Sequence, residues 1–195
     1  MSIIKRIINE FFFKIIHFSY KKTISPYTRY NDLLSRSWYL TDEYEKHVNS
    51  SIQTFKQKGY SDFYIDIGAN IGFTTINNYQ DFKKIFCFQP PETVSTIQKS
   101  NIKICCDSTE NITLFNYGIG ANEGDFELMV PKNNFGGAFI VDGNLYNKDI
   151  LAEKDGFKSF ERDNYYKEQI AVVNERFLQN NVFNQLSLES KGVIK

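Results

Sequence analysis

The residues best suited to chemistry lie in one short stretch, YIDIGANIGFTT, at positions 64–75. An apolar run that contains Asp66 leads directly into Gly68 and Gly72, and a helix-compatible segment follows. Gly68 would let a ligand approach the backbone without a Cβ in the way, and Gly72 would let the helix begin tight against a sheet. Asp66 could accept a hydrogen bond from a ligand ammonium, while the helix N-terminus favours a carboxylate. The stretch therefore predicts a site for an amino-acid head group.

A dinucleotide site fits the same stretch poorly. The fingerprint Gly-x-Gly-x-x-Gly is not met, because Asn70 occupies the middle position, and this disfavours a nicotinamide-binding domain. Taken alone, two glycines after a strand fit a purely structural turn equally well. Gln89, however, stands 23 residues after Asp66, at the end of the next predicted strand. Ribose-binding folds place there a residue that accepts hydrogen bonds from the sugar hydroxyls, so this context favours a nucleoside ligand.

The pattern around this stretch alternates between strands and helices, which is typical of a parallel sheet with crossover helices. Apolar runs predict three buried strands, at residues 62–67, 83–88 and 111–116. Helices are predicted after Ile71 and over residues 90–104, where proline is tolerated in the first turn. The later segments predict a hairpin at 124–141, a loop at 144–167, a strand at 168–173, a short helix at 174–181 and half a strand at 191–195.

Two helical segments are predicted upstream. Asp42 is the candidate N-cap of a helix at about residues 43–58, with Glu45 completing a capping-box arrangement and Gly59 ending the helix. Nearer the N-terminus, apolar residues recur with a helical period over residues 3–18, interrupted by charges that argue against a membrane-spanning helix. This stripe could pack on the domain or on a second subunit, or make peripheral contact with an anionic membrane surface.

Composition narrows the class of partner. The 195 residues include 23 basic and 23 acidic side chains, so the overall charge gives no reason to expect a nucleic-acid partner. The three cysteines form no Cys-x-x-Cys pair, which argues against a zinc site, and we expect no metal. We expect Cys87 to be buried, and Cys105 and Cys106 to end a helix. Reduced cysteines and the absence of a visible secretory signal favour the cytoplasm, or the inner face of the membrane if residues 3–18 bind there.

Three blocks of the chain resemble successive blocks of the FkbM family of S-adenosylmethionine-dependent methyltransferases. They read YIDIGANIGFTT, IFCFQPPETVSTIQKSNI and ITLFNYGIGANEGDFELMVPKNNFGGAF. The resemblance covers about residues 62–195 and implies an α/β, Rossmann-like class I methyltransferase fold with a doubly wound sheet. It divides the chain into an N-terminal helical extension, residues 1–60, and a partial methyltransferase domain, residues 61–195. The implied activity is O-methylation of a sugar, glycan or other hydroxylated small molecule, with S-adenosyl-L-methionine as cofactor.

The resemblance also implies roles for individual residues. The cofactor-binding positions that it assigns are Asp66, Gly68, Ala69, Asn70, Gly72, Thr75, Gln89, Asn116 and Tyr117. Of these, Gln89 falls on the ribose position, while Asn116 and Tyr117 lie where the adenine end is expected. No catalytic base is assigned, since His17 and His47 lie outside the matching blocks. The loop PKNNFGGAF could face the acceptor through Asn133 and Asn134, although an ordinary hairpin turn explains it equally well.

Two departures from the family pattern change what we expect of this chain. The family has Glu at the position of Gln89, and a carboxylate can accept from both ribose hydroxyls, whereas Gln accepts through one oxygen. We therefore expect cofactor binding to be weaker by about 1–2 kcal/mol. Family members also continue with further strands beyond the equivalent of residues 191–195, so we expect a truncated sheet, incomplete on its C-terminal side. The alternative to an active methyltransferase is thus an inactive remnant or a cofactor-binding fragment.

Overall fold

Three short apolar runs form the parallel sheet that the sequence predicts. The computed structural model describes residues 45–132, 135–140 and 165–185. Its first sheet contains β1 (Phe63–Ile67), β2 (Lys84–Phe88) and β3 (Ile112–Phe115). These strands pair in parallel in the order β1-β2-β3, with Asp66 opposite Cys87 and Cys87 opposite Leu114. The carboxyl ends of all three strands therefore meet at one side of the sheet, which we call the carboxyl edge.

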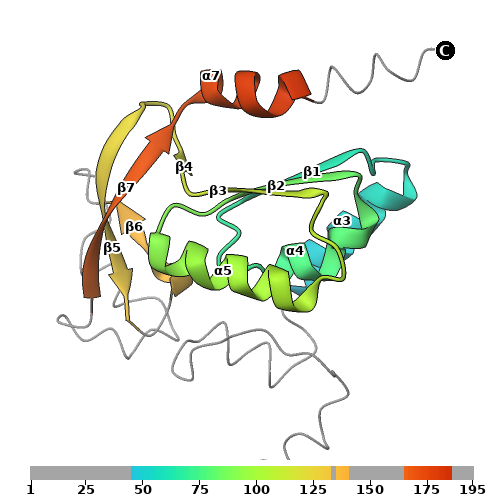
Figure 1. The fold of residues 1–195 in the computed structure, drawn as a ribbon, viewed down its shortest axis with the longest axis horizontal. Coiled ribbons are helices and arrows are strands. Elements are labelled where there is room, and N and C mark those ends of the chain that lie inside the picture. The colour runs from blue at the N-terminus through green and yellow to red at the C-terminus, as the bar shows by residue number, and fades with distance from the viewer. Residues whose placement is uncertain (1–44, 133–134, 141–164, 186–195) are drawn as a thin grey trace, which may run out of the picture.

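Helices cover one face of this sheet (Figure 1). They are α3 (Lys46–Gln57), α4 (Phe73–Asn78) and α5 (Glu92–Cys105). Ile52 of α3 packs with Ile85 and Cys87 of β2 in one buried cluster, because alternate residues of a strand point to the same side. The predicted helices after Ile71 and over residues 90–104 are confirmed, as are the burial of Cys87 and the helix end at Cys105.

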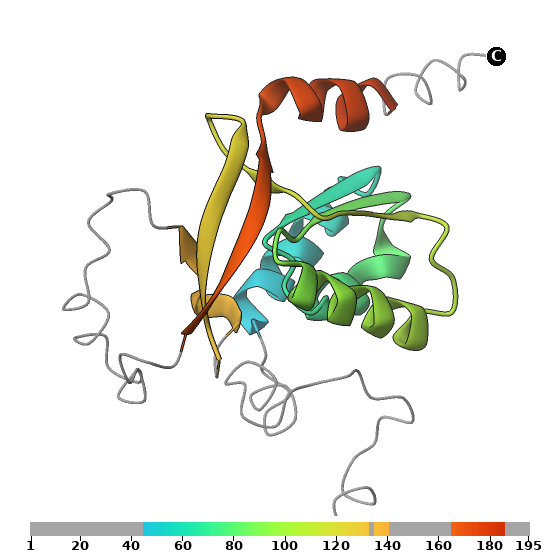
Figure 2. The same cartoon turned by 60° about the vertical axis from the view of Figure 1, so that its left-hand side comes forward.

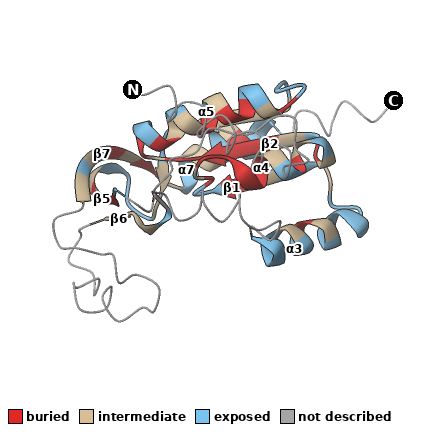
Figure 3. Cartoon of the chain, turned by 90° about the horizontal axis from the view of Figure 1, so that it is seen from below, coloured by how far each residue is buried: buried red, intermediate tan, exposed pale blue. Residues whose placement is uncertain are grey.

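The opposite face of the sheet is covered by the last described segment, α7 (Glu175–Leu178) and η3 (Gln179–Phe183). Val182 of η3 packs with Phe86 and Phe88, whose side chains point away from Ile85 and Cys87. Figure 3 shows β2 in red, in agreement with burial of its last four residues. The chain therefore has an α/β architecture built around a parallel sheet, and the short helix predicted at 174–181 is confirmed.

A second, mixed sheet lies beside the first (Figure 2). In the order β4-β7-β5-β6, its strands are β4 (Gly118–Ile119), β7 (Tyr165–Val173), β5 (Gly124–Pro131) and β6 (Phe139–Ile140). β5 and β6 form the predicted hairpin, but they pair at two positions only, whereas β5 pairs with β7 at eight. The prediction of a loop over 144–167 is wrong at its end, since β7 already begins at Tyr165. Long-range pairing with β5 extends this strand, and a local pattern does not reveal such pairing.

Apolar side chains on one face of the second sheet hold it against the first helical layer. Leu128 of β5 and Ile170 of β7 form one buried cluster with Ile71, Phe73 and Val94. A one-residue slip of either strand would turn this face to solvent, so burial fixes the register of β5 against β7. The second sheet is thereby fixed next to α5 and next to the chain that links β1 to α4.

The helix predicted at 43–58 is confirmed, but its start differs from the prediction. α3 begins at Lys46, and Glu45 is its N-cap in a left-handed conformation, with φ 45°. Glu45 therefore occupies the N-cap position itself and not the third helical position that a capping box requires, and its Oε2 accepts a hydrogen bond from Thr74 Oγ1 at 2.7 Å. A tertiary contact with α4 has taken the side chain that local spacing assigned to the cap. Gly59 follows the helix with φ 90°, as predicted.

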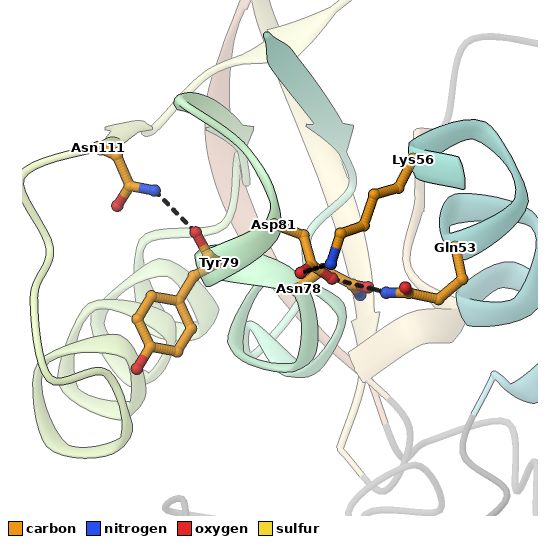
Figure 4. A network of polar contacts seen from close by, with 6 residues as sticks. All are labelled: Gln53, Lys56, Asn78, Tyr79, Asp81 and Asn111. Carbon is orange, nitrogen blue, oxygen red and sulfur yellow. Dashed lines mark hydrogen bonds and ion pairs between the residues drawn. The ribbon is translucent and has the colours of Figure 1, made fainter. Parts of the chain in front are cut away.

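Polar side chains join α3 to the end of α4 and to η1 (Tyr79–Asp81), as Figure 4 shows. Gln53 Nε2 donates to Asn78 Oδ1 at 3.1 Å and to Asp81 Oδ2 at 2.6 Å, and Lys56 forms an ion pair with Asp81. Asn78 Nδ2 in turn donates to Asn49 Oδ1 and to the Thr74 carbonyl, both at 2.8 Å. Asn78 is only 2% exposed, so every polar group of its side chain depends on these partners.

We expect Asn78→Ala to lower the free energy of unfolding by about 1–3 kcal/mol, because it leaves buried hydrogen-bonding groups without partners. Asn77→Ala changes an exposed residue of the same helix and is expected to stay within about 0.5 kcal/mol of wild type. Urea denaturation of both variants measures the difference. Equal losses in the two variants would contradict a structural role for Asn78.

Several predicted features lie outside the described residues. They are the stripe at residues 3–18, Asp42, His17, Asn133, Asn134, residues 144–164 of the predicted loop and the half-strand at 191–195. Within the described ranges, none of the helices has both the length and the apolar character needed to cross a membrane.

Candidate functional site

The predicted cofactor residues gather at the carboxyl edge of the parallel sheet. Residues 68–72 connect β1 to α4, and we call them the β1 loop. The N–H groups of Gly68 and Ala69 both donate to the Phe88 carbonyl of β2, at 2.9 and 3.2 Å. One strand further, the Gln89 N–H donates to the Phe115 carbonyl of β3 at 3.0 Å. These bonds continue the pairing of the sheet beyond its last strand residues and fix the β1 loop beside Gln89.

Left-handed backbone conformations shape the β1 loop. Gly68, Asn70 and Gly72 have φ values of 76°, 51° and 92°, which glycine adopts without strain and asparagine tolerates better than most residues. A Cβ on Gly72 would lie 3.2 Å from Gln98 Cγ of α5, whereas a Cβ on Gly68 would have no atom within 4 Å. Gly72 is therefore needed for close packing on α5. Gly68 instead leaves open space beside the loop, where a ligand could approach the backbone.

Asp66 lies beneath the loop and is bonded within the protein. It is 8% exposed, and its Oδ2 accepts a hydrogen bond from Thr75 Oγ1 at 2.8 Å. Thr75 Oγ1 also lies 3.2 Å from Cys87 Sγ. Its hydrogen bond with Thr75 joins β1 to α4, and the role of Asp66 toward a ligand ammonium stays a prediction. Asp66 and Thr75 therefore hold the frame on which the β1 loop rests.

Burial shifts the pKa values of Asp66 and Cys87. It raises the pKa of Asp66 to about 6, although the hydrogen bond from Thr75 opposes the shift and the Glu45 carboxylate adds to it. Burial also raises the pKa of the Cys87 thiol to about 12. A nucleophilic cysteine must be a thiolate, so Cys87 is not activated for covalent chemistry at neutral pH.

Gln89 directly follows β2 and is 7% exposed. Its Oε1 accepts a hydrogen bond from the Asn70 N–H at 2.7 Å. The oxygen that the sequence assigned to a ribose is therefore bonded to the backbone of the β1 loop. This bond brings together two predicted site residues that are 19 positions apart in the chain.

Asn116 and Tyr117 follow β3 at the same edge. Asn116 Nδ2 donates to the carbonyls of Gln89 and Pro90, at 2.7 and 2.8 Å, and no described residue donates to its Oδ1. Tyr117 is 37% exposed, and its ring meets the Phe177 ring of α7 edge to face at 5.4 Å. An exposed aromatic ring and an amide oxygen beside Gln89 suit a flat ligand ring that carries a hydrogen-bond donor.

Two buried polar residues of α5 support the β1 loop, and the sequence analysis did not predict this role for them. Asn101 is fully buried, and its Nδ2 donates to the Ile71 carbonyl at 2.9 Å. Gln98 is 1% exposed and packs against Gly72. Both residues lie on the buried side of α5 with Val94 and Ile102, so polar residues on an otherwise apolar helix face were the available signal.

Two buried amide atoms beside the β1 loop have unmet hydrogen bonds. Among the described residues, Asn70 Oδ1 and Gln98 Nε2 are buried side-chain atoms without a hydrogen-bond partner. His47 lies exposed on α3. No group of three or more His, Cys, Asp and Glu side chains in the described part of the chain could hold a metal ion. The carboxyl edge is thus the candidate site, and its chemistry is that of binding through the backbone, amides and an aromatic ring.

Comparison of the chain with protein-family models, with curated proteins and with solved structures finds no match. The family resemblance and the roles that it implies therefore rest on the residues themselves.

The raised pKa of Asp66 predicts a specific dependence of stability on pH. The folded state favours the protonated carboxyl, so the stability that protonation provides is lost as pH rises through about 6. When the pH is lowered from 7.5 to 5, we expect the free energy of unfolding of wild type to rise by about 1 kcal/mol relative to that of Asp66→Asn, in which residue 66 cannot titrate. Urea denaturation at both pH values measures this change.

Asp62→Asn is the matched control, because it removes a carboxylate that is 74% exposed just before β1. Because Asp66 is unchanged in this variant, we expect the difference in free energy of unfolding between wild type and Asp62→Asn to be the same at the two pH values. If the free energies of unfolding of wild type and Asp66→Asn differed by the same amount at pH 7.5 and pH 5, this would contradict a buried Asp66 with a raised pKa.

Proposed function

We propose that this chain binds S-adenosyl-L-methionine at the carboxyl edge and transfers its methyl group to a hydroxyl of a sugar, glycan or other small molecule. The observation that carries the proposal is the β1 loop. Its left-handed residues lie between a buried parallel strand and a helix, and the Asn70 N–H is bonded to Gln89 at the end of the next strand. In open α/β sheets, nucleoside ligands bind in the crevice outside this end of the strands.

Each of the predicted cofactor-binding residues has a role in this proposal. Gly68 leaves room for the amino-acid part of the ligand to approach the backbone, and Gln89 would contact the ribose. The Asn116 oxygen and the Tyr117 ring would bind the adenine end, through a hydrogen bond and ring contact. Asp66 and Thr75 hold β1 and α4 in place, and Ala69 and Gly72 fix the path of the loop.

The reaction asks little of acid–base groups in the protein. When bound, S-adenosyl-L-methionine supplies an activated methyl group on a sulfonium. The chain's contribution is then to bind the cofactor and to orient the acceptor hydroxyl in line with that methyl group, which can provide much of the rate. A base for the hydroxyl proton would add to this, and no described residue is assigned to that role.

A pair of glycine variants tests the proposed site. Gly68→Ala and Gly59→Ala each place a Cβ on a left-handed residue, with φ 76° and 90°, and neither Cβ meets an atom within 4 Å. Both variants should lose similar stability, about 1–2 kcal/mol, from backbone strain. Only Gly68→Ala alters the proposed site, so we expect it alone to weaken binding of S-adenosylhomocysteine, by about tenfold or more. Isothermal titration calorimetry at a temperature where both variants are folded measures the two affinities.

The same calorimetry distinguishes the outcomes. Absence of binding to folded wild type, or equal affinities in the two glycine variants, would contradict a cofactor site at the β1 loop. Binding without methyl transfer to any member of a panel of sugars and glycans would instead favour a cofactor-binding fragment over an enzyme.

A further inference from the structure

Glu168 interrupts the apolar face that the second sheet buries. Alternate residues of a strand point to the same side, so Glu168 shares its side of β7 with Ile170 and Val172, which are 4% and 5% exposed. Its partner in the register of β5 is Leu128, which is 5% exposed and belongs to the same buried cluster. The alternating pattern alone would place an apolar side chain at this position.

The protein satisfies only one of the two oxygens of this carboxylate. Glu168 Oε1 accepts a hydrogen bond from the Thr93 N–H at 3.2 Å, whereas Oε2 is buried and accepts no hydrogen bond from any described residue. None of the ion pairs between described residues includes Glu168, and the neighbouring Lys167 pairs with Glu127 at 2.7 Å. A buried carboxylate oxygen without a partner costs free energy of folding. Stability therefore does not account for a carboxylate at position 168.

The bond to Thr93 connects the second sheet to the start of α5, the end of that helix beside β7 in Figure 1. The N-cap residue of α5 is Pro91, which makes no side-chain cap. Glu168, 75 positions away in the chain, supplies an acceptor there instead, and negative charge is favourable near a helix N-terminus. Thr93 is exposed, so water could satisfy its N–H in the absence of Glu168. The consequence of the bond is therefore a fixed position for the start of α5.

The position of α5 in turn affects the candidate site in two places. Gln89 lies four residues before Thr93, in the turn that joins β2 to α5. Further along the helix, Asn101 Nδ2 donates to the Ile71 carbonyl of the β1 loop at 2.9 Å. A shift at the start of α5 would therefore change the positions of Gln89 and of the β1 loop.

We propose that Glu168 is a positioning residue of the candidate site: it holds the start of α5 against the second sheet, and α5 holds Gln89 and the β1 loop in the arrangement that binds ligand. Glu168 acts through α5 and does not contact the ligand. The binding part of this proposal rests on the nucleoside cofactor proposed above. Loss of the carboxylate should weaken ligand binding without lowering stability, whereas loss of a purely structural residue would lower both.

The positioning of α5 is tested without ligand, by hydrogen exchange of backbone amides measured by NMR. Glu168→Met has a side chain of similar length without oxygen, whereas Glu168→Gln keeps an oxygen that can accept from Thr93. We expect the Thr93 amide to exchange about fivefold faster in Glu168→Met, and within about threefold of the wild-type rate in Glu168→Gln. The Ile85 amide of β2 is the internal reference, because it donates to the Asn111 carbonyl at 2.7 Å. Unchanged Thr93 exchange in Glu168→Met, or equal acceleration of Ile85, would overturn the proposal.

Urea denaturation separates positioning from a purely structural role. We expect the denaturation midpoint of Glu168→Met to equal or exceed that of wild type, because this variant lacks the buried oxygen without a partner. Gln169→Met is the matched control, since Gln169 is the next residue of β7 and is exposed. It should leave Thr93 exchange unchanged. A midpoint of Glu168→Met clearly below that of wild type, or failure of this variant to fold, would overturn the proposal by assigning Glu168 to stability.

Calorimetry with S-adenosylhomocysteine tests the effect on the site. We expect Glu168→Met to bind about fivefold more weakly than wild type, because its site is less preorganised, and we expect Glu168→Gln and Gln169→Met to bind nearly as wild type does. Wild-type affinity in Glu168→Met would overturn the link between Glu168 and the site. If folded wild type does not bind S-adenosylhomocysteine, the cofactor proposal fails and the binding part fails with it, whereas Thr93 exchange still decides whether Glu168 positions α5.

Discussion

The hydrogen bond from the Asn70 N–H to Gln89 Oε1 joins the ends of two neighbouring strands, and the shape of the proposed site depends on it. It lies next to the bonds from Gly68 and Ala69 to the Phe88 carbonyl, so the whole β1 loop is bonded to the end of β2. Loss of such a bond in a partly buried place leaves a polar group without a partner, which is costlier than the bond's own net contribution. The loop is therefore held in one shape before any ligand arrives, and a preorganised loop is what close approach of a ligand requires.

The rigidity of the β1 loop depends on β2, the strand to which it is hydrogen-bonded. β2 is buried from both sides, with Ile85 and Cys87 facing α3 and with Phe86 and Phe88 facing η3. Phe88 stacks on Phe115 at 4.7 Å, and Phe115 meets Phe177 of α7 edge to face at 5.5 Å. Packing of this kind fixes the positions of Gln89 and Asn116, which directly follow the two strands. The second sheet adds support from the side, since its apolar face packs on the residues that lead into α4 and α5.

The sequence was sufficient for the features that depend on local pattern. Apolar runs predicted β1, β2 and β3, and the alternation of strand and helix patterns predicted α4 and α5. Features that depend on distant partners were not predictable in this way. The early start of β7 depends on pairing with β5, and the left-handed Glu45 is bonded to Thr74 through a contact 29 residues away. The hydrogen bonds of Asp66 with Thr75 and of Gln89 with Asn70 were not predictable either. Residue type and spacing alone do not show which hydrogen-bond partner a polar side chain will have.

Cofactor binding at the carboxyl edge is tested most directly by titrating ¹⁵N-labelled protein with S-adenosylhomocysteine and following the backbone amide resonances. We expect the largest chemical-shift changes at the carboxyl edge, at Gly68, Asn70, Gly72, Gln89 and Tyr117. Amides of α3 and of the exposed ends of β5 and β7 should shift little, because they lie on elements outside that edge. No shifts at saturating ligand, or a set of shifts centred elsewhere in the described chain, would contradict the placement of a nucleoside cofactor at the β1 loop.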